Sequence, residues 1–534
     1  MPLSRRRFLA RAIAASALAF APLERLAASV LFRSDPFQLG VASGEPAADG
    51  FVLWTRVAPE PHQPELLGSS VYEVAWEVAT RPDFAEVAAR GTALARPHLA
   101  HAVHVEVGGL AAGREYFYRF RLGRYESPVG RAVTAPAAGT PVDRLRFAIT
   151  SCAHYEHGFF SAYRFIAEDR PELVLALGDY IYEASFGRSR VRMFDVPEAV
   201  TLADYRRYYC QYRLDPDLQA AHAACPWLLS WDDHEVENDY VGFTSEHGLC
   251  GGEPVQAAFP ARRAAAYKAW FEHMPVRPSR LLPDAGIRLW DTVDWGALAR
   301  FYLLDTRQFR SPQACSAPPN EVRCDTVAGR KIRRGGTGGN NRVDPGEPAC
   351  RAELDDPSRT FLGAEQERWL DEAFGQSRAR WNLIAQAVMF APMIEGSAAA
   401  PRVRTDNWSG YPPARERLLA SLARHRVVNP VILTGDVHAF AVNLVHDARG
   451  RSAACEFVGS SISADTTDLS SQQPLNPQML YQDGSRNGYV RFEAAADRLR
   501  ADLVGLDDVR DPRSGRTTLA SFEVADGNRV PRRL

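Results

Sequence analysis

Candidate metal ligands follow short apolar runs of the chain. Gly178 and Asp179 come directly after the run Leu173–Leu177, and Tyr182 lies three residues further on. A continuous apolar run that stops at a glycine is typical of a parallel strand buried on both faces. Ligands of open α/β sheets collect beyond the carboxyl ends of such strands. The pattern therefore predicts Asp179 as a ligand, with the Tyr182 phenol in reach of anything that it binds.

Three further predicted strands end in side chains of the same kind. These are Cys152 after one run, the segment Trp231–Glu235 after the next, and Asp436 with His438 after a later one. Carboxylate oxygens can bridge two cations, while His, Tyr and Cys supply softer, ion-specific positions. Each residue alone is as readily a turn or cap residue. Together they predict a site for more than one metal ion.

The elements that must position these residues follow a strand–helix order. We expect strands at residues 145–150, 173–177, 227–231, 299–304, 381–386 and 430–434, and helices at 159–169, 257–274, 364–375 and 414–424. This alternation implies a parallel sheet with right-handed crossovers. The pattern predicts an α/β region over residues 141–534. In it, residues 488–523 return to alternating strands that close a sheet edge, and residues 311–357 form an irregular insertion.

The region before residue 141 has a different pattern. Short alternating runs near residues 51–56, 71–79, 103–110 and 115–122 lack helical spacing and predict a small β-sandwich over residues 29–140, of the immunoglobulin or fibronectin type. Two domains also agree with a length of 534 residues, which exceeds what one core usually organises. The fold class is therefore α/β (α+β), with the sandwich first. A net charge of −2 argues against a nucleic-acid partner.

The N-terminus has the pattern of an export signal. A cluster of arginines precedes Phe8 and Leu9, a mildly apolar stretch follows at residues 12–21, and small residues lie near 26–28. This stretch is too short to span a bilayer. Residues 1–28 are predicted to be a twin-arginine signal, read by the twin-arginine translocase. The alternative is a basic tail. The mature protein is expected in the periplasm or outside the cell, without a membrane span.

The eight cysteines agree with an oxidising compartment. We expect disulfides within two groups whose pairing the spacing leaves open, Cys315, Cys324 and Cys350 in one and Cys210, Cys225 and Cys250 in the other. No Cys-x-x-Cys occurs, which argues against a structural zinc knuckle.

The ordered motifs resemble those of a known superfamily. The motifs are Ser-Cys152, Gly-Asp-x-x-Tyr182, Asp-Asp-His-Glu235 and Gly-Asp-x-His438, with Gly40-Val-Ala-Ser-Gly44, Leu-Trp-Thr-Arg56 and Leu304-Asp-Thr-Arg307. This series is similar to the calcineurin-like metallophosphoesterases, in detail to the PhoD-type alkaline phosphatases, which are related to purple acid phosphatases. The resemblance covers nearly the whole chain. It implies a two-sheet core flanked by helices.

The resemblance also implies roles for the ligands. Asp179 would bridge the metals, and Cys152, Tyr182 and His438 would hold Fe³⁺. Asp233 and Asp436 would hold Ca²⁺, because these carboxylates replace an Asn and a His of the wider superfamily and oxygen ligands favour calcium. His234 would contact the substrate phosphate and protonate the leaving oxygen.

Several assignments have alternatives. Cys152 could belong to a disulfide, and His154 and His157 could compete as ligands. Asp305 and Arg307 could bind phosphate or form an ion pair that positions their loop. Glu235, Glu237 and Asn238 are expected to cap turns, and the stretch Ser463–Asp468 and Tyr489 could approach the site.

These inferences predict an exported phosphatase. It is expected to hydrolyse small phosphomonoesters and phosphodiesters with a metal-activated hydroxide or oxide. One alternative is a phospholipase D-like phosphodiesterase. Another is an extracytoplasmic binding protein with purely structural metals.

Overall fold

The computed structural model describes most of the chain. The described residues are 31–186, 190–194, 196–246, 253–282, 286–315, 324–327, 330–333 and 342–534. The predicted export signal at residues 1–28 lies outside them. No helix within these ranges has the length and apolar character needed to cross a membrane.

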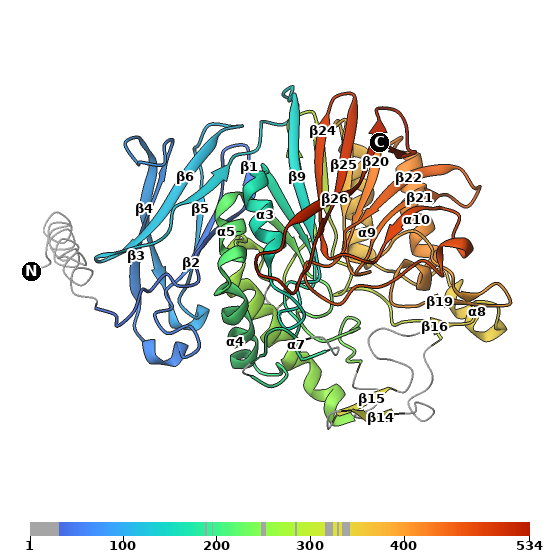
Figure 1. Cartoon of the computed structure of the whole chain (residues 1–534), viewed down its shortest axis with the longest axis horizontal. Coiled ribbons are helices and arrows are strands. Elements are labelled where there is room, and N and C mark those ends of the chain that lie inside the picture. The colour runs from blue at the N-terminus through green and yellow to red at the C-terminus, as the bar shows by residue number, and fades with distance from the viewer. Residues whose placement is uncertain are drawn as a thin grey trace, which may run out of the picture.

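Two large sheets form the centre of the molecule (Figure 1). The ten-stranded sheet has the order β27 (Arg532–Arg533), β26 (Arg516–Ala525), β25 (Arg498–Leu506), β24 (Gly488–Ala495), β9 (Arg144–Thr150), β10 (Leu173–Leu177), β11 (Pro226–Ser230), β1 (Val41–Ala47), β2 (Gly50–Arg56) and β5 (Ala102–Val107). The seven-stranded sheet has the order β12 (Asp291–Trp295), β13 (Ala299–Leu303), β17 (Trp381–Ala385), β20 (Pro430–Thr434), β22 (Ser452–Val458), β21 (Phe440–His446) and β23 (Met479–Asp483). The predicted strands pair in parallel in both sheets.

Apolar side chains from both sheets fill the space between them. Leu175 of β10 shares this buried core with Leu383 and Phe457 of the second sheet. The next residue of β10, Ala176, points to the opposite face and packs under the helices, as alternation along a strand requires. The strand is therefore buried on both faces, as its continuous apolar run predicts.

Helices cover the outer face of each sheet (Figure 1). The ten-stranded sheet is covered by α3 (Ser161–Asp169), α4 (Leu202–Arg213), α5 (Pro216–Ala224) and α7 (Glu253–His273). The seven-stranded sheet is covered by α9 (Ala364–Gln376) and α10 (Pro412–Arg424). The helices α4 and α5 were not predicted from the sequence. The buried face of α4 consists mainly of tyrosines, which gives a weak helical hydrophobic pattern.

The N-terminal region contributes a second layer of strands. The strands β3 (Tyr72–Ala79), β4 (Val87–Ala95), β6 (Glu115–Leu122), β7 (Tyr125–Glu126) and β8 (Gly130–Val133) form one sheet. This sheet packs across a buried apolar core on β1, β2 and β5. However, β1 also pairs in parallel with β11. The sandwich therefore shares a sheet with the large region, and a domain boundary at residue 140 stays a prediction.

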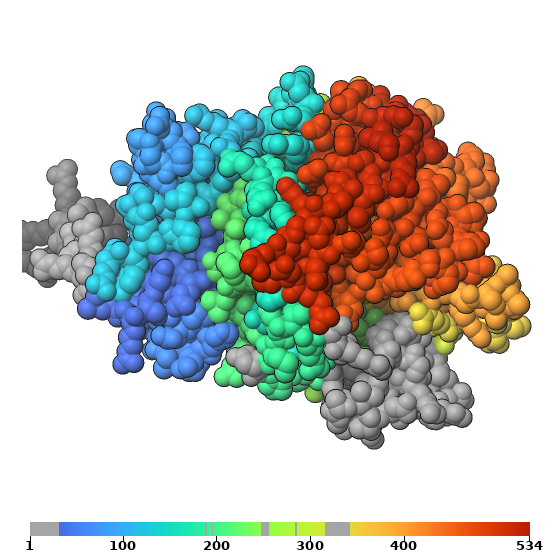
Figure 2. All heavy atoms as spheres, in the orientation of Figure 1, coloured from blue at the N-terminus to red at the C-terminus, as the bar shows by residue number. Residues whose placement is uncertain are grey.

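The C-terminal strands close one edge of the ten-stranded sheet, as predicted. Phe492 of β24 pairs with Phe147 of β9, and the two rings stack with centroids 4.7 Å apart. Figure 2 shows this C-terminal segment across the middle of the visible face. A hairpin is formed by β14 (Cys324–Val327) and β15 (Arg330–Arg333). A separate small sheet has the order β16 (Arg342–Val343), β19 (Ala400–Arg404) and β18 (Glu395–Ser397). This small sheet lies next to α8 (Pro348–Leu354) (Figure 1).

One predicted group of cysteines forms a disulfide and the other does not in the described part of the chain. Cys315 and Cys350 are joined. Cys210 and Cys225 are free and buried, so the prediction that they form disulfides is wrong. Cys210 instead accepts a hydrogen bond from Arg56 at 3.1 Å. Cys250 lies outside the described residues.

Candidate metal centre and active site

Ends of parallel strands from both sheets meet at one cavity of about 400 Å³. Cys152 follows β9, Asp179 follows β10, and Asp436 and His438 follow β20. Three sets of side chains place their ligand atoms within 4.8 Å of one another. The sets are Cys152, Asp179 and His438; Asp179, Asp233 and His234; and Asp179, Asp232 and Asp436. Asp179 belongs to all three, so it occupies the position expected of a bridging residue.

Four of these residues have a left-handed backbone. The φ angles are 59° at Cys152, 53° at Asp179, 62° at Asp436 and 58° at His438. Such conformations cost about 1–3 kcal/mol each in residues other than glycine, and they cluster at functional sites. Gly178 precedes Asp179 because a Cβ at this position would lie 2.6 Å from the backbone nitrogen of Asp232. Asp179, Asp436 and His438, which follow these turns, line the cavity.

Tyr182 links Asp179 and His438. Its hydroxyl donates to Asp179 Oδ2 at 3.0 Å and lies 3.0 Å from His438 Nε2. His438 Nδ1 lies 2.7 Å from the carbonyl oxygen of Asp465 and must carry the proton that it donates. Nε2 is then an acceptor, and the single Tyr182 proton cannot serve both neighbours. This side of the cavity has more acceptors than protons, which is what a cation site requires.

The acidic groups on this side are shifted toward their neutral forms. Burial raises the pKa of the Cys152 thiol well above its usual value, and the Asp179 carboxylate raises it further. Burial and Asp179 raise the pKa of Tyr182 in the same way. Asp179 Oδ1 is buried without a hydrogen-bond partner in the described structure. A bound cation would satisfy this oxygen and would favour the thiolate and phenolate.

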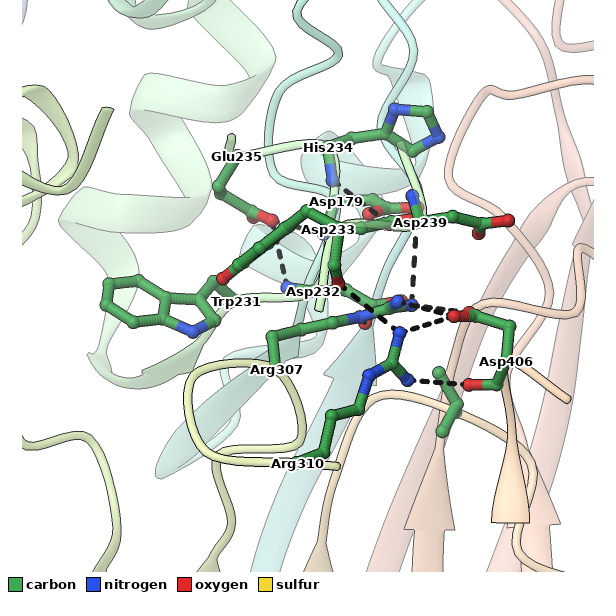
Figure 3. A network of polar contacts seen from close by, with 12 residues as sticks. Asp179, Trp231, Asp232, Asp233, His234, Glu235, Asp239, Arg307, Arg310 and Asp406 are labelled. Atoms are coloured by element: carbon green, nitrogen blue, oxygen red, sulfur yellow. Dashed lines mark hydrogen bonds and ion pairs between the residues drawn. The ribbon is translucent and has the colours of Figure 1, made fainter. Parts of the chain in front are cut away.

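The opposite side of the cavity consists of carboxylates around a buried arginine (Figure 3). Arg307 donates to both oxygens of Asp406 at 2.9 Å and also to Asp232. Its Nη2 lies 3.6 Å from Asp233 Oδ2. Of the two alternatives for Arg307, this geometry supports the ion pair. Asp305 accepts from the backbone nitrogen of Arg307 at 3.0 Å and caps the loop.

Asp233 and Asp436 have opposite pKa shifts. Burial acts to raise the pKa of Asp233, but the Arg307 and His234 charges outweigh it and lower the pKa. The backbone nitrogens of His234 and Asp239 also donate to Asp233. Burial and the Asp233 charge raise the pKa of Asp436 to about 6. Arg307 therefore favours the ionised form of Asp233. The Asp436 carboxyl, whose pKa is raised, would need a further positive charge to favour its ionised form.

His234 lies at the cavity with its ring fixed by Glu183. His234 Nδ1 is 2.8 Å from Glu183 Oε2. Burial acts to lower the pKa of the imidazole, but Glu183 and Asp233 outweigh burial and raise it. The protonated ring is favoured, and its second nitrogen is a donor for an anion in the cavity.

Comparisons with known proteins identify the family. The family model described as PhoD-like phosphatase matches residues 147–503, and that of the PhoD-like phosphatase N-terminal domain matches residues 24–136. The chain belongs to the PhoD-like phosphatase family. Alkaline phosphatase D of Bacillus subtilis (strain 168) is 41% identical over 509 residues, which cover 92% of this chain and 81% of that protein. A solved structure titled "Structure of PhoD" is 38% identical, with a TM-score of 0.84 and coverage of 95% of this chain and 93% of that one. The chain is therefore an enzyme that hydrolyses phosphate esters.

Other predicted residues of this PhoD-like phosphatase have capping or packing contacts. Glu235 accepts hydrogen bonds from the backbone nitrogens of Asp179, Tyr180 and Asp232, which agrees with its predicted capping role. His154 and His157 stack on each other with centroids 3.7 Å apart. Neither belongs to a set of possible metal ligands among the described residues.

Two C-terminal segments, Ser463–Asp468 and the residue Tyr489, were predicted to approach the site, and one of them does. The carbonyl oxygen of Asp465 holds His438, and Thr467 lines the cavity. Tyr489 instead donates to Asp169 at 2.7 Å and does not line this cavity. Only the first of the two segments reaches the site.

Several residues of the PhoD-like site were not predicted from the sequence. Asp239 and Asp406 form a further set with Asp233, all within 4.8 Å. Neither of the two follows a predicted strand, so no local pattern marked them. Glu183, which holds His234, lies at the end of the Asp179 segment and had no assigned role.

Proposed function

We propose that this chain is an exported, metal-dependent phosphatase that hydrolyses phosphomonoesters and also phosphodiesters. The observation that carries this proposal is the cavity in which Asp179 belongs to three sets of possible ligands. Family membership supplies the reaction class, and the ligand types supply the metal dependence.

The two sides of the cavity suit different ions. Cys152, Tyr182 and His438 would hold Fe³⁺ together with Asp179, because thiolate and phenolate donors stabilise a trivalent ion. Asp233 and Asp436 would hold Ca²⁺ with Asp179, because hard oxygen ligands suit calcium. The unpartnered Asp179 Oδ1 supports both assignments. When bound, the ions would supply positive charge for the phosphate oxygens and acidify the attacking water.

His234 would act on the substrate directly. Glu183 fixes its ring through Nδ1, so the other nitrogen can donate to a phosphate oxygen and then protonate the departing alcohol. Arg307 would keep Asp232 and Asp406 in place rather than contact the phosphate, because its donors are already occupied by these carboxylates.

Metal content and substrate range test this function together. Protein purified with its metals should contain iron and calcium by elemental analysis and should hydrolyse p-nitrophenyl phosphate and bis(p-nitrophenyl) phosphate. A visible thiolate- or phenolate-to-iron absorption band is expected. Phosphate binding without turnover, or protein that is active and free of metal, would contradict the proposal. Preferred cleavage of phosphatidylcholine would favour the phospholipase D-like alternative.

The export prediction has its own test. Residues 1–28 fused to a reporter that folds in the cytoplasm should carry it to the periplasm. Replacement of Arg5 and Arg6 by lysine should retain the reporter in the cytoplasm, because the signal depends on the arginine pair. Equal export of both fusions would contradict the twin-arginine assignment.

A further inference from the structure

Two arginines stand opposite each other at the cavity. Arg342 of β16 pairs directly with Arg404 of β19, so both side chains lie on one face of the small sheet. Both line the same cavity as Asp179 and His438. Figure 1 shows β16 and β19 close to α8, away from the central strands β9 and β10 that precede Cys152 and Asp179. The small sheet thus brings positive charge to a cavity whose candidate metal ligands come from other elements.

The arrangement of charges on this sheet is unfavourable by itself. Like charges directly opposite each other destabilise a strand pair. Among the described residues, the carboxylate within ion-pair distance of either guanidinium is Glu395, which accepts from the Nε of both. Glu395 is the one ion-pair partner of both guanidiniums among the described residues, and Asp436 and Asp239 act on Arg404 from a longer distance. Two arginines kept directly opposite each other break a local rule of strand pairing, which points to a functional reason.

The guanidiniums retain donors for a ligand. Glu395 fixes each arginine through Nε, and the described structure gives the terminal nitrogens of Arg404 no protein acceptor within hydrogen-bond distance. An arginine held in this way presents a planar fork, which matches phosphate geometry. The volume of about 400 Å³ is typical of a small-molecule pocket and exceeds the needs of a single phosphate group.

We propose that Arg342 and Arg404 form a second anion subsite, which binds a phosphate group carried by the alcohol part of the substrate. The preferred substrate is then a phosphate ester whose alcohol bears a second phosphate. This inference rests on the proposed function of the cavity, because it takes the phosphate to be cleaved to lie beside Asp179 and His234. The apolar side chains of Met389, Met393 and Leu469 line the same cavity and would contact the carbon chain.

A matched series of substrates tests the subsite. Alkyl monophosphates of three to six carbons are compared with the α,ω-bisphosphates of the same length, using metal-loaded enzyme and phosphate release as the assay. The best bisphosphate should have a KM about tenfold or more below that of its monophosphate partner, as charge-assisted hydrogen bonds to a second phosphate imply. High salt should reduce this preference.

Variants locate the effect. Arg404→Gln and Arg342→Gln should each remove most of the bisphosphate preference, and Arg404→Lys should keep part of it because the charge remains without the fork. Arg402→Gln is the matched control. Arg402 lies on the same strand and within 3.6 Å of Asp344, but it does not line the cavity. Thermal unfolding of each variant shows whether the fold is retained.

Two results would overturn the inference. One is the absence of a bisphosphate preference in the unmodified enzyme that hydrolyses the monophosphates. The other is a rise in KM by the same factor for both members of each pair in the Arg404 and Arg342 variants, which is the outcome if the arginines only stabilise the small sheet. Failure of the proposed function would look different, because metal-loaded enzyme would then hydrolyse none of the esters.

Discussion

The two sides of Asp179 differ in how their charge is balanced. One side contains Cys152, Tyr182 and His438, where hydrogen-bond acceptors outnumber the protons that can be donated. Burial shifts the thiol and the phenol toward their neutral forms. On the other side, Arg307 already neutralises part of a carboxylate cluster. Ligands at strand ends thus form one set that has no positively charged partner within it and one set that Arg307 partly balances. This contrast predicts different responses to substitution.

Removal of the shared residue should have the largest effect. Asp179→Asn should lower kcat/KM by about 10⁴-fold or more, equivalent to about 5.5 kcal/mol, because both ligand sets lose a charged member. Iron and calcium should both fall in elemental analysis. Asp497→Asn, at an exposed ion pair, is the control and should leave activity and metal content unchanged. Retained turnover in the Asp179 variant would contradict the role of Asp179 as a ligand shared by both metals.

Loss of the buried arginine should destabilise only the carboxylate side. Arg307→Met leaves Asp232 and Asp406 buried without their partner, which should lower the free energy of unfolding by about 3–5 kcal/mol. Urea unfolding with a chelator present measures this. Arg498→Met, at an exposed pair, should cost less than about 1 kcal/mol. A similarly small loss at Arg307 would show that the carboxylates are not balanced by this residue.

Single ligands should separate the two metals. Cys152→Ser should remove the visible band and most of the iron while calcium is retained, and Asp436→Asn should do the reverse. We expect each to lower kcat by about 10²–10³-fold, or about 2.7–4 kcal/mol. Absorption spectra and elemental analysis of the two variants side by side provide the measurement. Loss of both metals in both variants would mean that the two sides bind their ions as one unit.

The smallest effect is expected at the residue that orients His234. Glu183→Gln should lower kcat for alkyl phosphates by about tenfold, a part of the 10²–10⁴ that a positioned acid contributes. The loss should be smaller for p-nitrophenyl phosphate, whose leaving group needs no proton. Equal losses with both substrates would contradict a role of His234 as the acid and would indicate a contact with the phosphate alone.

Local patterns predicted the central strands and helices well. The apolar runs of β10 and β20 begin and end where the sequence analysis placed them, because a strand buried on both faces needs an unbroken apolar run. The helix α4 was missed. Its buried positions are four tyrosines together with Cys210 and Arg213. Amphipathic and charged side chains give no clear contrast between a buried and an exposed face.

Contacts between distant segments were predicted less well. Cys210 and Cys225 were expected, with Cys250, to form a group that contains a disulfide, because the three flank a polar stretch. Each of the first two is instead buried as a free thiol. Asp406 reaches the site from the loop before the helix α10 and has no sequence signal of its own. Its place is set by Arg307, which lies 99 residues earlier in the chain.

The sequence by itself determined which side chains stand at the ends of buried strands, Cys152, Asp179, Asp233 and His438 among them. Polarity patterns are local, so they reveal where a strand stops and which residue follows it. Only the tertiary structure decided that strand ends of two different sheets meet at one cavity, that Arg307 balances one side of it, and that Arg342 and Arg404 line it. Those relations depend on sheet order and packing, which no short stretch of sequence contains.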